Sequence, residues 1–211
     1  MKQGIFISIE GPDGSGKSTQ ISFIKEYLEN KNFEVILTRE PGGTLIGEKI
    51  RSIILDVNHK QMSNMTEALL YAASRAQHVE EVIKPALEQG KVVICDRFVD
   101  SSIAYQGYGR KLGESVEIIN SYAIAGCMPV LTLLLKLDPQ IGTSRINDCV
   151  KDRLEQEKLQ FHQDVYEGYL EIERRYKGRV VGIDASRNIE DIRKDIQRQI
   201  DLVLEKCNNV I

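Results

Sequence analysis

The stretch "GPDGSGKST" at residues 11–19 follows the apolar run "IFISI" at 5–9 and precedes a segment whose apolar residues recur at helical spacing. Gly11, four intervening residues and the run "GKS" at 16–18 form the pattern of a glycine-rich loop that joins a strand to a helix and surrounds phosphate groups. Glycine suits such a loop because a Cβ would obstruct the close approach of several backbone N–H groups to one phosphate. The stretch therefore predicts a strand, a phosphate-binding loop and a helix, in that order.

Two side chains at the end of this loop fit the chemistry of a nucleoside triphosphate. Lys17 can reach the β and γ phosphates, and Ser18 can ligate a magnesium ion at the positive end of the helix dipole. The alternative is a flexible glycine turn with a solvated lysine, which the flanking strand and helix disfavour. The residues predicted to bind the triphosphate are those of the whole loop: Gly11, Pro12, Asp13, Gly14, Ser15, Gly16, Lys17, Ser18 and Thr19.

The chain has 211 residues, of which 42% are hydrophobic, and a formal net charge of −3. This length and composition fit one domain over residues 1–211, and the acidic balance argues against broad nucleic-acid binding. Four cysteines lie far apart without a C-x-x-C pair, which indicates reduced thiols rather than a zinc site or disulfides. With no signal-peptide pattern and no apolar run long enough to cross a membrane, we expect a cytoplasmic protein without a membrane or nucleic-acid partner.

Five short apolar runs, at residues 5–9, 33–38, 91–95, 130–137 and 179–183, alternate with helical segments. Helices are expected at 45–55 and at 66–88, the second capped by Thr66 and bent near Pro85. The alternation predicts right-handed βαβ units and therefore an α/β fold, with a five-stranded parallel sheet flanked by helices in three layers. Ligands of such a sheet bind beyond the carboxyl ends of its strands.

Asp96 and Arg97 follow the predicted strand at 91–95, so they lie at the same edge of the sheet as the glycine-rich loop. A carboxylate there can hold a magnesium ion or its water shell, and a guanidinium can grip a phosphate through two hydrogen bonds. A surface ion pair would give the same sequence. Beside the glycine-rich loop, the pair favours phosphoryl transfer, which needs metal, lysine and arginine charges around the migrating group.

Five segments carry a resemblance to a known family: "EGPDGSGKST" at 10–19, "TREPGGT" at 38–44, "EALLYAASRAQH" at 67–78, "VVICDRFVDSSIAYQGYGR" at 92–110 and "DRLEQEKLQFH" at 152–162. The chain resembles thymidylate kinases over nearly its whole length, and "DRF" with "SSIAYQG" is more specific than the phosphate loop. The resemblance implies a P-loop kinase fold and transfer of the γ-phosphate of ATP to dTMP, giving dTDP and ADP on the way to dTTP. It also implies Mg²⁺ as cofactor and a homodimer, for which small residues at Ala68, Ala72, Ala73 and Ala76 leave room.

The resemblance also implies roles in binding the thymine nucleotide. Tyr71, where the family more often has phenylalanine, would stack on the base, and Arg75, one helical turn later, would donate to a base carbonyl. From the residues alone, an exposed Tyr–Arg pair is the alternative. Tyr105 would pack beneath the sugar, and Asp13 would approach its 3′-hydroxyl. The residues predicted to bind dTMP are Arg39, Glu40, Arg51, Tyr71, Arg75, Arg97, Ser102, Tyr105 and Gln106.

The phosphate loop has no arginine between Gly11 and Gly16, and the resemblance then implies that a lid supplies one. We expect a mobile lid at about 142–157, with Arg153 as the first candidate for the transferred phosphate and Arg145 as the second; Lys151 is expected to be a solvated charge. A lid suits this role because its closure expels water and brings charge to the transition state. The predicted catalytic residues are Asp13, Lys17, Asp96, Arg97, Arg145 and Arg153, and the predicted metal ligands are Ser18 and Asp96.

Two other classes of protein share the phosphate loop. A nucleoside kinase acting on thymidine would not need several arginines around its acceptor, and a regulatory or motor NTPase would hydrolyse nucleotide without an acceptor. No N-K-x-D motif for reading guanine occurs in the chain. A noncatalytic nucleotide-binding module is disfavoured by Asp13, Asp96 and Arg97 together.

Overall fold

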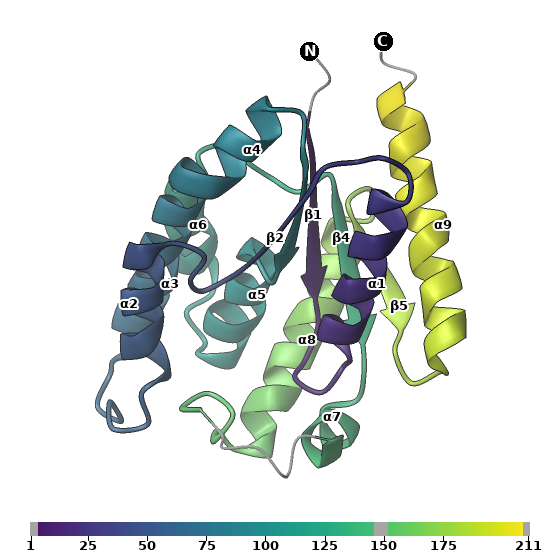
Figure 1. Cartoon of the computed structure of the whole chain (residues 1–211). Helices are drawn as coiled ribbons and strands as arrows, with labels where there is room; N and C mark the ends of the chain where they lie inside the picture. Colours follow the sequence, from purple (N-terminus) through teal and green to yellow (C-terminus); the bar gives the residue numbers. More distant parts are fainter. Residues whose placement is uncertain (1–3, 146–151, 209–211) are drawn as a thin grey trace.

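A computed structural model describes residues 4–145 and 152–208 (Figure 1). The five strands are β1 (Ile5–Glu10), β2 (Val35–Arg39), β3 (Val92–Asp96), β4 (Leu131–Lys136) and β5 (Val180–Asp184). They pair in parallel in the order β2-β3-β1-β4-β5. The predicted α/β fold with a five-stranded parallel sheet is thus confirmed, and each strand lies within two residues of its predicted ends.

Helical segments connect the strands and cover both faces of the sheet. They are α1 (Lys17–Glu29), α2 (Leu45–Leu55), α3 (Asn64–His78), the π-helical segment η1 (Val79–Ile83), α4 (Lys84–Glu88), α5 (Val99–Ser102), the π-helical segment η2 (Ile103–Gly109), α6 (Glu114–Ile124), α7 (Pro139–Arg145), α8 (Leu159–Arg175) and α9 (Ile189–Asn208). None of the helices in the described part of the chain has the length and apolar character that a membrane crossing needs.

The alternation of side chains along the central strand divides the core into two layers. Ile5, Ile7 and Ile9 of β1 pack with α1 and α9 on one face, whereas Phe6 packs with η1, α5, η2 and α8 on the other. Both faces of β1 are therefore dry, which explains its continuous apolar sequence. The carboxyl ends of β1, β2 and β3 meet at one edge, since Asp96 is in register with Ile9 and Arg39.

The predicted helix at 66–88 differs in detail. The hydroxyl of Ser63, not Thr66, caps α3 by accepting from the Thr66 N–H at 3.1 Å. The single helix is divided by the π-helical segment before Pro85. The outer surface of α3 is apolar as well: Leu69 is 50% exposed, and Ala73 and Ala76 are also exposed.

Candidate active site

The glycine-rich loop joins β1 to α1 through positive φ angles of 140° at Gly11, 76° at Gly14 and 88° at Gly16. Lys17 begins α1 and folds back, so that its Nζ donates to two loop carbonyl oxygens at 3.0 and 3.1 Å. Burial, reinforced by the charge of Arg97, lowers the pKa of Lys17 to about 8. The loop thus holds a desolvated amine among backbone groups, the arrangement in which phosphate oxygens can replace the carbonyl partners.

Arg97 connects this loop to the neighbouring cavity. Its guanidinium donates to Asp13 Oδ1 and to the carbonyl oxygen of Gly11 at 2.9 Å. It also lies 5.2 Å from the centre of the Tyr105 ring, whose hydroxyl donates to Asp13 Oδ2 at 3.2 Å. Burial would raise the pKa of Asp13, but the charges of Arg97 and Lys17 outweigh it and lower that pKa to about 2. Asp13 is therefore ionised at neutral pH and holds Arg97 and Tyr105 together.

Asp96 ends β3 beside the start of the loop. Its Oδ1 is buried and has no hydrogen-bond partner among the described residues, which is typical of a carboxylate that receives its partner from outside the chain. Ser18, exposed at the start of α1, offers a second hard oxygen donor. In the described ranges, no three or more His, Cys, Asp or Glu side chains gather to hold a metal. The residues present thus fit a magnesium ion that depends mainly on phosphate oxygens and water.

A cavity of about 160 Å³ opens beside Arg97. Segments that follow β2 and β3 meet there with α3 and η2, because parallel strands end at the same edge of the sheet. Nine residues predicted from the sequence line this cavity: Asp13, Glu40, Arg51, Tyr71, Arg75, Arg97, Ser102, Tyr105 and Gln106.

Arg75 lies in the wall of this cavity and is only 1% exposed. Its Nε donates to Glu40 at 2.7 Å, its Nη1 to Ser102 at 3.0 Å and to Asn120, and its Nη2 to a backbone carbonyl oxygen at 3.0 Å. Four of the five N–H groups thus have partners in the described chain, and one Nη2 N–H is left for a ligand. The alternative of an exposed Tyr71–Arg75 pair is wrong, because α3 turns both residues toward the cavity.

A family model described as "Thymidylate kinase" matches residues 9–196. The chain belongs to the thymidylate kinase family. It is 51% identical over 204 residues to a thymidylate kinase of Halalkalibacterium halodurans, covering 95% of this chain and 97% of the relative. A thymidylate kinase of a Geobacillus species is 50% identical over 194 residues, covering 90% and 92%. The crystal structure of thymidylate kinase from Ehrlichia chaffeensis superposes with a TM-score of 0.76 at 32% identity, covering 94% and 99%.

Two of the arginines predicted to bind dTMP, Arg39 and Arg51, occupy different places. Arg51 lines the cavity and donates to the carbonyl oxygen of Pro41 at 2.9 Å. Arg39 lies outside the cavity lining, exposed, and donates through Nη2 to both carboxylate oxygens of Glu48 at 2.9 and 3.0 Å. The structure therefore brings Arg51, but not Arg39, to the cavity.

The two candidate arginines of the expected lid also lie in different places. Arg145, at the end of α7, donates to the carbonyl oxygen of Gly14 in the phosphate loop at 3.2 Å. Arg153, the first candidate, donates instead to the carbonyl oxygen of Ile54 at 2.8 Å and to Glu67 at 2.6 Å. The structure thus places Arg145, not Arg153, beside the phosphate loop. Lys151 and the rest of 146–151 lie outside the described residues.

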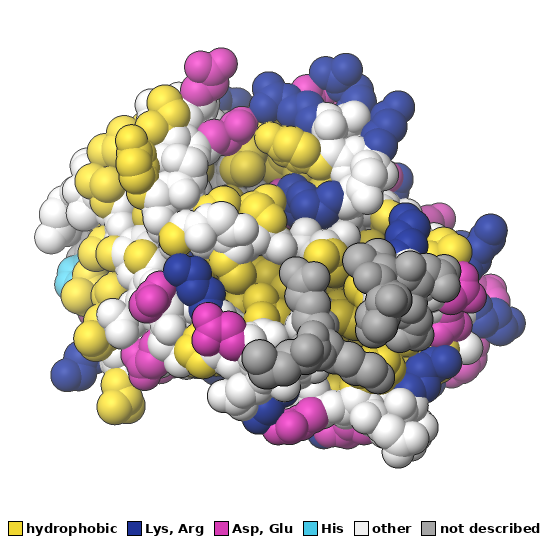
Figure 2. Space-filling model, turned by 90° about the horizontal axis from the view of Figure 1, so that it is seen from above, with side chains coloured by type: hydrophobic (Ala, Val, Ile, Leu, Met, Phe, Trp, Pro, Cys, Tyr) yellow, Lys and Arg dark blue, Asp and Glu magenta, His cyan; other side chains and the backbone are white. Residues whose placement is uncertain are grey.

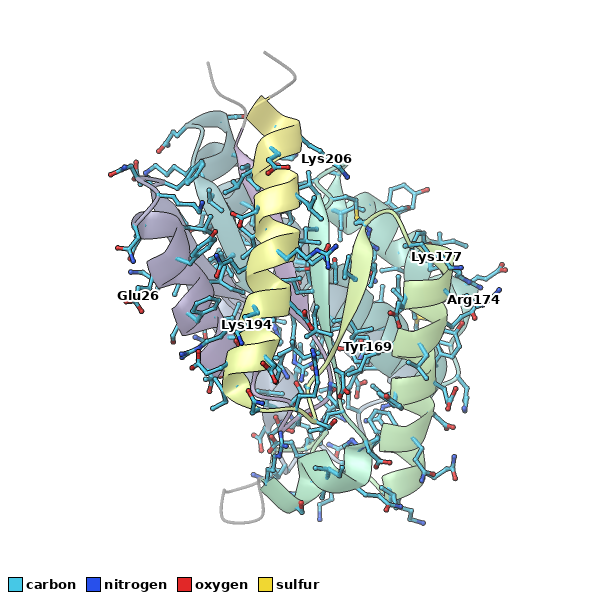
Figure 3. The ribbon with its side chains drawn as sticks, turned by 90° about the vertical axis from the view of Figure 1, so that its right-hand side faces the viewer. Glu26, Tyr169, Arg174, Lys177, Lys194 and Lys206 are labelled. Carbon is cyan, nitrogen blue, oxygen red and sulfur yellow. The ribbon has the colours of Figure 1, made fainter. Side chains whose placement is uncertain are left out.

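Three residues of the site were missed by sequence reasoning. Glu10 is buried at the end of β1 and accepts hydrogen bonds from the Phe98 N–H at 2.7 Å and from the hydroxyls of Ser101 and Tyr169. Tyr169 points from the inner side of α8 toward the sheet (Figure 3) and also accepts from Arg97 at 3.0 Å. Burial, with the charge of Asp100 adding to it, raises the pKa of Glu10 to about 8. Position directly before the glycine loop was the only sequence signal for Glu10.

The third missed residue is Glu67, in the first turn of α3. It is 1% exposed and accepts hydrogen bonds from Gln106, Arg110 and Arg153. In the sequence, a glutamate at this position looks like an exposed residue that favours the helix dipole. Nothing local indicates that three distant side chains surround it.

Proposed function

We propose that this member of the thymidylate kinase family phosphorylates dTMP by binding the phosphates of ATP in the glycine-rich loop and dTMP in the cavity beside it. The observation that carries this assignment is Arg97, which lines the cavity and contacts both Gly11 and Asp13 of the loop. Because the Arg97 guanidinium reaches both the loop and the cavity, it can hold the phosphates of ATP and of dTMP as they approach in line. The products are dTDP and ADP.

The reaction needs little proton transfer from the protein. The acceptor phosphate is an anionic nucleophile near neutral pH, because its second pKa is about 6. Lys17 and Arg97 then supply positive charge to oxygens on the migrating and acceptor groups, and the ionised Asp13 keeps Arg97 in place. Positioning and charge neutralisation therefore account for the catalysis.

Ser18 and Asp96 are the residues that would hold Mg²⁺, directly or through its water shell. When bound, the ion neutralises charge on the phosphate oxygens of ATP. The unpartnered Asp96 Oδ1 supports this assignment. For the lid over residues 142–157, we assign the arginine that meets the transferred phosphate to Arg145, since Arg153 is already paired with Glu67.

An ADP-production assay with ATP and Mg²⁺ across the nucleoside monophosphates and thymidine tests this function. We expect dTMP to be the best acceptor and thymidine to be inactive, since thymidine has no phosphate for Arg97. Lys17→Ala should lower turnover by a factor of about 10² or more with the fold intact. Faster reaction with thymidine, or ATP hydrolysis that ignores the acceptor, would refute the assignment.

We also infer a homodimer of these single-domain chains in the cytoplasm. Apolar side chains gather on the flank formed by α3 and α6, on the left in Figure 2, where Leu69 is 50%, Ile118 60% and Tyr122 82% exposed. Ala73 and Ala76 are exposed and leave room for a second copy, whereas Ala68 and Ala72 are buried within the chain. Sedimentation of the wild type and of Leu69→Asp tests this: a wild type that stays monomeric at micromolar concentration contradicts the dimer.

A further inference from the structure

Glu67 lies behind the wall of the acceptor cavity and accepts four hydrogen bonds. Oε1 accepts from Gln106 Nε2 at 3.0 Å and from Arg110 Nε at 3.1 Å, and Oε2 accepts from Arg110 Nη2 at 3.0 Å and from Arg153 Nη2 at 2.6 Å. Although burial opposes ionisation, these donors lower the pKa of Glu67 below its usual value. Glu67 is therefore an ionised group that only accepts hydrogen bonds.

This acceptor fixes the orientation of the Gln106 amide. An amide has one donor end and one acceptor end, so a carboxylate at one side must attract the NH₂ group and turn the oxygen away. Gln106 is 1% exposed and lines the cavity, and its Oε1 is buried without a hydrogen-bond partner in the described ranges. A buried oxygen without a partner is costly unless a ligand supplies the missing donor.

Arg75 lines the same cavity, and one of its Nη2 N–H groups has no partner within the described residues. The cavity wall thus offers a donor from Arg75 and an acceptor from Gln106. This pair matches a ring edge that carries a carbonyl oxygen beside an N–H, as the imide of thymine and uracil does. Cytosine presents an amino group beside an unprotonated ring nitrogen. Its amino donor would therefore face the Arg75 donor, and its ring-nitrogen acceptor would face the Gln106 oxygen, which is also an acceptor.

We propose that Glu67 is a positioning residue that selects a pyrimidine imide over cytosine by holding the Gln106 oxygen toward the base. The proposal rests on the assignment of this cavity to the acceptor nucleotide. Glu67 touches no substrate itself and acts through the amide. Without its charge, the Gln106 amide is free to turn over and to offer its NH₂ group to the ring nitrogen of cytosine.

Glu67→Gln is the sharpest test, because it keeps the shape of the side chain and removes the obligatory acceptor. Steady-state kcat and KM are measured for dTMP, dUMP and dCMP with saturating ATP and Mg²⁺. We expect the ratio of kcat/KM for dTMP over dCMP to fall by a factor of about 10 or more. The loss should appear mainly as a higher KM for dTMP, with its kcat nearly unchanged, because the phosphates are held elsewhere.

Glu157→Gln is the matched control. Glu157 pairs with Arg110 Nη1 at 2.6 Å and does not line the cavity, so this variant loosens the same cluster without freeing the amide. We expect it to keep the wild-type ratio. If Glu67→Gln does not fold, Glu67→Asp keeps the charge near both arginines but withdraws it from the amide, and the same ratio is measured.

An unchanged dTMP/dCMP ratio in a folded Glu67 variant would overturn the proposal, as would an equal loss in Glu157→Gln. A wild type without preference for dTMP or dUMP over dCMP would instead count against the assignment of the cavity. The two failures are therefore distinguishable.

Discussion

The affinity for ATP should fall as the pH rises from 7 to 9, because Lys17 progressively loses its charge in the ligand-free protein. Its pKa of about 8 means that half of the Lys17 side chains are neutral at pH 8 and about nine in ten at pH 9. Phosphate oxygens at the loop favour the ammonium form, so each neutral amine must take up a proton when ATP binds. The apparent Kd for ATP should therefore rise about twofold at pH 8 and about tenfold at pH 9, relative to pH 7.

Titration calorimetry in buffers with different ionisation enthalpies measures this proton directly. With Mg²⁺ and ATP at pH 8, we expect Lys17 to take up about half a proton per bound ATP. Glu10 also has a pKa of about 8, and its charge acts on Lys17, so a proton bound or released by Glu10 could be counted as well. The measurement is therefore repeated with Glu10→Gln, which leaves Lys17 as the group to be counted. Affinity that is independent of pH between 7 and 9.5, without proton uptake in Glu10→Gln, would refute the reasoning.

Three other perturbations follow from the same contacts. The folded protein retains the Glu10 proton up to about pH 8, far above its usual pKa of 4.5, so stability should fall as pH rises between these values, by at most about 1.4 kcal/mol per unit. Glu10→Gln should flatten that decline in thermal melts; an unchanged profile contradicts it. Arg97→Ala should lower kcat/KM for dTMP by about 10² or more, with Arg97→Lys intermediate in the ADP assay. Gly14→Ala should lower the melting temperature, because Gly14 has a positive φ and a Cβ there would overlap the carbonyl oxygen of Gly142. A wild-type melting temperature would contradict this and show that α7 can move away from the loop.

The sequence predicts the strands well because their signals are local. In β1, β3 and β4 nearly every residue is buried, so unbroken apolar runs mark the strands without knowledge of their neighbours. The surface of α3 was harder to assign. Leu69 and Ala73 share helical spacing with buried residues such as Val79, yet they lie on the outer surface. Apolar periodicity marks a helix, but it does not distinguish the chain's own core from a second apolar surface.

The residues of the site also fall into two groups, those that a local sequence pattern predicts and those that it does not. The glycine loop could be predicted because one short motif contains the necessary geometry, whereas the place of Arg75 in the cavity was expected only from the family resemblance. The partner of Arg153 could not be predicted, because Glu67 lies 86 positions away and competes with every other carboxylate near the lid. A charged residue carries no local sign of burial, so Glu10 and Glu67 looked like ordinary solvated acids at a strand end and a helix start.

Buried carboxylates also explain how an acidic chain can recognise an anionic nucleotide. Glu10 holds Ser101 beside Arg97, Glu40 holds Arg75, and Glu67 holds Gln106. Each of the three side chains orients a neighbouring polar group, and Glu10 does so as a neutral acid at neutral pH, because its pKa is about 8. Because a donor or acceptor fixed in advance loses less freedom on binding, these acids improve recognition even though the charges of Glu40 and Glu67 alone would repel phosphate. Neutral, isosteric replacements of Glu40 and Glu67 should therefore weaken selectivity and orientation rather than strengthen the binding of anions.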